Sequence, residues 1–247
     1  MDFFTTTGTG ERGFDLFDGV HCGWLLGVVL AAAALCVVHR RLSAKGRRVM
    51  QRTFALTMFG VYLFRQIVLM AMGEYDVFYL PLHLCGMSLY IEPIDSLFPN
   101  KFTRELCYAV CMPGALLGIL YANWGNLPLL SFISITSFVL HAMLVIYPLF
   151  AITGGDHRPS PRRILWCFGF LLAVSVPVYF FNMHFGTNYM FLAEPSPGSP
   201  LEMFENWFGN PGYLLGFVIM IAIVWVLMYL PFGIIEAREK RLASEKE

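Results

Sequence analysis

The chain has 247 residues, of which 57% are hydrophobic and only 14% are charged, and its formal net charge is zero. Soluble domains carry charged side chains at about a quarter of their positions, so this composition excludes an ordinary soluble protein. The zero net charge conceals a strong segregation of the basic residues along the chain.

Seven mostly apolar runs are long enough to cross the roughly 30 Å hydrocarbon core of a bilayer. In chain order they are residues 21–38, 54–72, 80–98, 106–124, 127–152, 164–183 and 212–235. Helices are expected because lipid offers no partner for unpaired backbone groups, and the runs are too long for barrel strands. The residues before the first run are polar and do not resemble a removable signal peptide. We therefore predict one all-α integral membrane domain over 1–247, a bundle of seven transmembrane helices.

The basic residues predict the orientation of this bundle. Of the 17 Lys and Arg residues, six lie in 39–52, two in 101–104, three in 158–163 and four in 238–246, so fifteen occupy alternate connections. Only Arg12 falls on the opposite side, and Arg65 lies inside a run. Because basic loops stay in the cytoplasm, the pattern predicts the N-terminus outside and the C-terminus inside. Topology already explains these basic loops, so we expect no nucleic-acid partner.

The longest connection, residues 184–211, is rich in Pro, Gly and aromatic residues and contains no Lys or Arg. A segment of this length can form a lid, and its aromatic side chains suit the headgroup level of a membrane. A solvated outer loop is the other reading of the same composition.

The cysteines do not predict a metal site or a cofactor. All six lie in or beside apolar runs, without the spacing of a disulfide framework or a zinc site. They are Cys22, Cys36, Cys85, Cys107, Cys111 and Cys167.

The third run, YLPLHLCGMSLYIEPIDSLF, contains the most polar groups. Pro81 suits the first helical position, which places Cys85 within the first turn and a half. The partial positive charge of a helix N-terminus favours a thiolate there. Helical spacing puts Ser88 and Glu92 on the face of Cys85 and His83 almost opposite.

Two further ionisable residues lie where lipid is expected. An extended Arg65 in the second run could reach Glu92, so we predict a structural ion pair between them, because an unpaired buried charge is hard to tolerate. His141 is the one residue of 127–152 that can carry a charge near neutral pH, and it follows Ser134 and Ser137 at helical spacing, so this polar stripe should face protein.

The strings LPLHLC at 80–85 and NMHFGTNYMFLAEPSPGSP at 182–200, with the mid-run His141, resemble the YwaF / transmembrane protein 164 family. The resemblance extends over the whole chain in length and number of runs. It implies an intramembrane acyltransferase that moves fatty acyl chains between phospholipids through a cysteine, distantly similar to the androgen-induced hydrolases. Carried over to this sequence, the nucleophile is Cys85 and the intramembrane histidine is His141.

This chemistry is coherent. A thiolate attacks an acyl ester, a histidine moves the proton, and a thioester divides one difficult step into two. Transfer to a lysophospholipid gives transacylation, and transfer to water gives hydrolysis. The oxyanion needs donors, for which the N–H groups at the helix start or the amides of Asn182 and Asn188 are candidates. Tyr189, in the same string, is a supporting candidate.

The predicted depths of Cys85 and His141 in the membrane conflict with their assignment as a nucleophile and its base. Measured from the outer ends of their runs, Cys85 lies about 7 Å down and His141 about 20 Å down. Either the third helix begins well below the surface, as a re-entrant 73–80 segment would allow, or the fifth begins in water. His184, which matches the depth of Cys85 better, is the rival base. The sequence leaves both open.

The prediction is thus a membrane acyltransferase or ester hydrolase acting on phospholipid or lysophospholipid, in a bacterial inner membrane rather than an endomembrane. A transporter or receptor that uses Arg65, Glu92 and His141 as a polar path is the alternative. An accessory subunit without chemistry is a third. The oligomeric state stays open.

Overall fold

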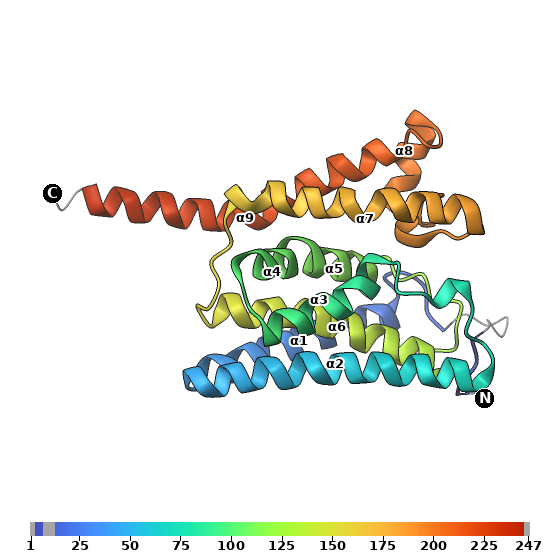
Figure 1. The fold of residues 1–247 in the computed structure, drawn as a ribbon, viewed down its shortest axis with the longest axis horizontal. Helices are drawn as coiled ribbons and strands as arrows, with labels where there is room; N and C mark the ends of the chain where they lie inside the picture. The colour runs from blue at the N-terminus through green and yellow to red at the C-terminus, as the bar shows by residue number, and fades with distance from the viewer. Residues whose placement is uncertain (1–2, 7–12, 245–247) are drawn as a thin grey trace.

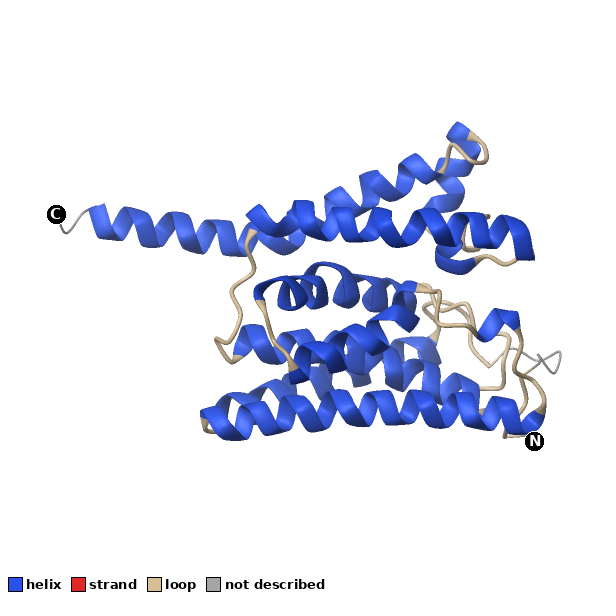
Figure 2. Ribbon diagram, viewed as in Figure 1, coloured by secondary structure: helices blue, strands red, loops and turns tan. Residues whose placement is uncertain are grey.

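The structure is a computed structural model, and it describes residues 3–6 and 13–244. Within these ranges the regular structure is helical throughout (Figure 2). Arg12 and Lys246, two of the basic residues on which the orientation was predicted, lie outside the described residues.

Six helical segments of the described chain are long and apolar enough to cross a membrane. The chain is therefore a multi-pass integral membrane protein. The segments are α1 (Gly19–Arg41), α2 (Ala44–Met72), the continuous run of α4 (Lys101–Leu106), η2 (Cys107–Cys111) and α5 (Met112–Leu120), then α6 (Phe132–Thr153), α7 (Ile164–Phe185) with its short lead-in η3 (Pro161–Arg163), and α9 (Leu214–Ser244).

The third predicted span is the exception. Its helix, α3, covers only Leu84–Leu97, 14 residues or about 21 Å, which is too short to cross the hydrocarbon core. The prediction that Pro81 begins this helix was wrong, because the chain before it forms the 3-10 helix η1 (Val77–Tyr79) and a tight turn. Pro81 folds back onto the helix start so closely that a Cβ on Gly86 would lie 3.0 Å from its Cα.

Successive segments run in opposite directions along the bundle (Figure 1). The α1–α2, α3–α4 and α6–α7 connections therefore meet at one end, together with the C-terminal end of α9. These are the segments that carry the basic residues, so we call this the basic end. The α2–α3, α5–α6 and α7–α9 connections lie at the opposite end, which we call the loop end.

The core is built around α6, which packs against α1, α2 and α5. Its Phe138 and Leu144 are fully buried with Met58 of α2 and Ile119 of α5. This burial fixes the relative heights of the helices that carry the polar residues.

A second layer of α7 and α9 lies on the far side of α4 and α5 (Figure 1). This layer is attached through a backbone carbonyl of the η2–α5 run that has no intrahelical donor because a proline follows it. Pro113 has no N–H to donate to the carbonyl of Ala109, and the π-helical turn η2 lies at this point. Trp225 of α9 donates its indole N–H to that carbonyl instead, at 2.7 Å.

The connection at 184–211 is structured in two places. It contains the 3-10 helix η4 (Tyr189–Phe191) and the short helix α8 (Pro200–Phe208). The buried Leu201 and Phe204 hold α8 against Tyr213, and Met203, Trp207 and Phe208 stay exposed.

Candidate functional site

Cys85 is the second residue of α3, at the loop end of the bundle. In this first turn the backbone N–H groups have no intrahelical acceptor, so the helix start places unpaired donors beside Cys85. The thiol is partly exposed, whereas Cys107, Cys111 and Cys167 are fully buried. Cys85 thus combines a helix N-terminus with access from outside, the conditions that favour a reactive cysteine.

The imidazole of His141 of α6 lies beside the Cys85 thiol, close enough for the two groups to influence each other electrostatically. Its Nδ1 lies 2.8 Å from the carbonyl oxygen of Ser137. A carbonyl can only accept, so Nδ1 carries the proton and Nε2 is left as the acceptor for the thiol. The arrangement is a nucleophile and a base, with the base oriented by a third group.

Sequence reasoning missed two residues that hold His141 in place. A Cβ on Gly118 of α5 would lie 2.9 Å from the imidazole Nε2, so glycine is required for this approach. On the other side the ring of Trp124 lies 5.1 Å from the imidazole, centroid to centroid. Neither residue carries catalytic chemistry, so no motif in the sequence points to them.

Arg65 of α2 donates from Nη1 to the hydroxyl of Ser137, at 3.2 Å. It does not pair with Glu92, so the predicted ion pair is wrong. Ser137 is buried and uses both its backbone carbonyl and its hydroxyl, the first for His141 and the second for Arg65. Arg65 therefore belongs to the group around Cys85 and His141.

Glu92 is fully buried, and neither of its carboxyl oxygens has a hydrogen-bond partner. The prediction failed because Arg65 lies only seven residues, or about 10 Å, from the loop end of α2, whereas Glu92 lies in the last two turns of α3 towards the basic end. Ser88, on the same face, donates its hydroxyl to the carbonyl of Leu84 at 2.8 Å. Neither side chain meets Cys85.

Asn182, at the end of α7, organises the connection 184–211, which we call the outer segment. Its side-chain oxygen accepts from the backbone N–H of Tyr189 at 2.9 Å and from the Thr187 hydroxyl at 2.8 Å. Its amide nitrogen donates to the carbonyl of Tyr189 at 2.9 Å. Tyr189 is buried, and its hydroxyl donates to the carbonyl of Val77.

His83 joins this segment to the start of α3. It is the N-cap residue, and its Nδ1 accepts from the backbone N–H of Met190 at 3.1 Å. Its ring packs against Tyr189, with ring centroids 4.9 Å apart. The outer segment thus lies directly beside the turn that presents Cys85.

Two other predicted residues have different positions from those expected. The side chain of Asn188 bonds only within the outer segment among the described residues. It accepts from the N–H groups of Ala193 and Glu194 and donates to the carbonyl of Glu194. The amides of Asn182 and Asn188 are thus occupied in holding the loop, which argues against their use as oxyanion donors. His184 is exposed, and its one ring contact among the described residues is with Phe185.

The conflict in depth between Cys85 and His141 disappears in the structure. Helix α6 begins at Phe132 instead of at residue 127, which places His141 about 14 Å from the helix start. Helix α3 begins at Leu84, below the turn formed by η1 and Pro81. Both differences reduce the separation, and the two side chains meet.

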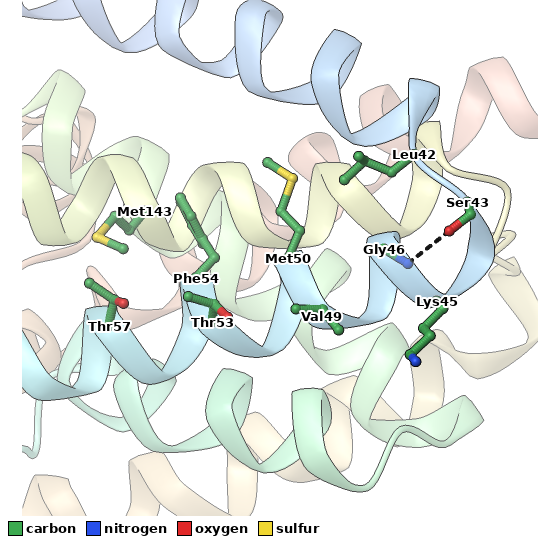
Figure 3. Close-up of a pocket in the computed structure, with 10 residues that line it drawn as sticks. All are labelled: Leu42, Ser43, Lys45, Gly46, Val49, Met50, Thr53, Phe54, Thr57 and Met143. Atoms are coloured by element: carbon green, nitrogen blue, oxygen red, sulfur yellow. Dashed lines mark hydrogen bonds between the residues drawn. The ribbon is translucent and has the colours of Figure 1, made fainter.

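A groove of about 720 Å³ lies away from these residues, at the basic end (Figure 3). It is mostly apolar and includes Met50, Phe54 and Met143, with Lys45 and Ser43 at one end. None of the predicted site residues lines it, so the candidate site is defined by the chemistry at Cys85. Among the described residues, no group of three or more His, Cys, Asp or Glu is placed to hold a metal ion.

The sequence profile of the TMEM164 family matches residues 16–229, a range that contains Cys85, His141 and the outer segment. The chain belongs to the TMEM164 family. The resemblance inferred from the LPLHLC and GTNYMFL strings is confirmed by this match. No curated protein and no solved structure matches the chain. Membership of the TMEM164 family leaves the reaction to be inferred from the side chains of the site.

Proposed function

We propose that this member of the TMEM164 family is an intramembrane acyltransferase that removes a fatty acyl chain from a phospholipid through a thioester on Cys85. The observation that carries the proposal is the Cys85–His141 pair. Its thiol lies at a helix N-terminus, its imidazole accepts at Nε2, and the carbonyl of Ser137 fixes the imidazole through Nδ1.

The reaction follows from this geometry in two steps. His141 Nε2 takes the thiol proton, and the Cys85 sulfur attacks the acyl carbonyl carbon. The C–O bond of the ester breaks, and the departing lysolipid oxygen takes the proton back from Nε2. A lysophospholipid hydroxyl then gives its proton to Nε2 and attacks the thioester, which restores the thiol; water in the same position gives hydrolysis.

The developing oxyanion needs hydrogen-bond donors. The backbone N–H groups of Leu84 and Cys85 are in the first turn of α3, where no carbonyl of the helix is available to them. With Asn182 and Asn188 used by the outer segment, these N–H groups are the donors that best fit the role.

The membrane topology is also part of the proposal. Helix α3 supplies a seventh pass between the two ends of the bundle, although it is short. The basic end is placed in the cytoplasm, and the loop end, with Cys85 and the outer segment, on the opposite side. The outer segment would act as a lid over the lipid entrance, in a bacterial inner membrane.

The alternative, a transporter or receptor, has less support. It requires a polar path through Arg65, Glu92 and His141, and no hydrogen bond or ion pair in the described part of the chain links Glu92 to either of the others. Isolated carboxyl groups do not form a relay.

Intact-protein mass spectrometry after incubation with phospholipid tests the enzyme. We expect an acyl-sized, hydroxylamine-sensitive adduct on the wild type and its complete loss in Cys85→Ala. Cys22→Ala is the matched control, because Cys22 is the exposed cysteine and the one most open to unspecific acylation. An adduct that survives Cys85→Ala, or no adduct on the wild type, would refute the cysteine mechanism.

A further inference from the structure

We infer that Arg65 binds the phosphate group of the lipid whose acyl ester reaches Cys85. The inference rests on the proposed function and names the residue that would recognise the phosphate of its phospholipid substrate. It starts from a cation that lies inside the bundle without an anion.

Arg65 lies between helices and is only partly exposed. Ser137 is its single hydrogen-bond partner among the described residues, and no carboxylate of that part of the chain lies within 4.0 Å of it. A guanidinium carries five N–H donors arranged to bind two oxygens of an anion at once. Most of this capacity is unused in Arg65.

Two other arginines inside the protein have a carboxylate partner, so the lack of one is particular to Arg65. Arg104 lies 3.2 Å from the carboxylate of Asp95, and Arg163 lies 2.7 Å from that of Glu105. The chain therefore supplies a carboxylate to each of these two. A cation in a membrane interior requires a counter-charge, so the partner of Arg65 has to come from a ligand.

The position of Arg65 suits a phospholipid. It lies about 10 Å from the loop end of α2, near the level at which α3 presents Cys85. Its charge is close enough to Cys85 to act on it electrostatically, and Ser137 connects it to His141. The phosphate and the nearer acyl ester of a glycerophospholipid are on adjacent glycerol carbons, so a bound phosphate places an ester beside the thiol.

Lipid binding to Cys85→Ala, measured by native mass spectrometry, tests this inference without any turnover. The two probes are a phospholipid and a diacylglycerol with the same acyl chains. Adding Arg65→Gln should weaken phospholipid binding at least about tenfold and leave diacylglycerol binding unchanged, and Arg65→Lys should retain part of the difference. Arg52→Gln is the control, because Arg52 bonds the carbonyl of Ser96 at the basic end.

Other outcomes would overturn the inference. Equal losses for both lipids, or a fall in thermal stability in Arg65→Gln and Arg65→Lys alike, would make Arg65 structural. Arg65-dependent retention of inorganic phosphate with no preference for phospholipid would assign the site to free phosphate. Because Cys85→Ala cannot form a thioester, these results are independent of whether the wild type is acylated, so the two proposals can fail separately.

Discussion

At the basic end of the bundle, Glu105 is fully buried yet accepts from Arg163 at 2.7 Å, from the hydroxyl of Tyr229 at 2.5 Å and from the backbone N–H of Ser160 at 3.0 Å. At the loop end, Arg65 has one hydroxyl partner and no carboxylate among the described residues. The first charge is enclosed by the protein, whereas the second keeps most of its donors unused.

Asp95 repeats the first pattern. It pairs with Arg104 and accepts from the hydroxyls of Tyr147 and Thr103 at 2.8 and 2.6 Å. Both carboxylates have partners for their two oxygens, and these partners join α3, α4, α6, η3 and α9. Unsatisfied groups beside a partly exposed thiol are available to a ligand. The contrast separates structural from functional charge within one bundle.

The largest effect on stability is expected for Glu105→Met. The substitution leaves Arg163 and the hydroxyl of Tyr229 without their partner, and breaking a buried pair in this way costs about 3–5 kcal/mol. Thermal unfolding in detergent should show a large loss. Glu239→Met is the control, because the Arg158–Glu239 pair is exposed to solvent and should contribute little to stability. Similar losses in both variants would contradict the role of Glu105.

The matched substitution Glu92→Met should act in the opposite direction. Glu92 is as deeply buried as Glu105, but its oxygens have no hydrogen-bond partner. Removing an unsatisfied polar group avoids a desolvation cost of about 1–3 kcal/mol, so stability should be unchanged or higher. The same unfolding measurement tests it. A loss comparable to that of Glu105→Met would mean that Glu92 has a bound partner.

A smaller effect is expected from pH at the basic end. Burial lowers the pKa of His157, and this outweighs the opposite influence of Glu105. The unfolded chain then binds a proton more readily than the folded protein, so stability is retained above the ordinary histidine pKa of about 6.5 and falls as the pH drops below it. Each unit between the two pKa values corresponds to about 1.4 kcal/mol.

His157→Gln should remove this part of the acid sensitivity, measured as the unfolding temperature between about pH 7 and 5. His184→Gln is the control, because His184 is exposed. A wild type that becomes more stable on acidification through this range would contradict the assignment to His157.

The residue types at the reactive centre could be read before the fold was known. Spacing placed Cys85 near a helix start and His141 on a stripe with Ser137, and the family resemblance paired Cys85 with His141; the structure brings the three together. Gly118 and Trp124 could not be found in this way. A glycine needed for close approach and an aromatic ring packed against an imidazole leave no pattern in a single sequence.

The partners of Arg65 and Glu92 show where such reasoning stops. Their ion pair was predicted from depths counted along apolar runs, but hydropathy does not fix where a helix begins. Pro81 folding onto Gly86 delays the start of α3, and Ser131 starts α6 by accepting from the N–H of Ser134. Shifts of four or five residues change depth by about 6–8 Å, enough to exchange one partner for another.

The sequence by itself determined that the chain lies in a membrane and that its basic residues belong at one end. It also showed which ionisable side chains would have a high free-energy cost in lipid and therefore need a structural or functional explanation. These follow from the transfer of side chains and backbone groups into lipid, which depends on local composition. Only the tertiary structure decided that His141 and not His184 meets Cys85, and that Ser137 and not Glu92 meets Arg65. Those choices depend on the relative heights of helices, which are set by caps, turns and packing between residues far apart in the chain.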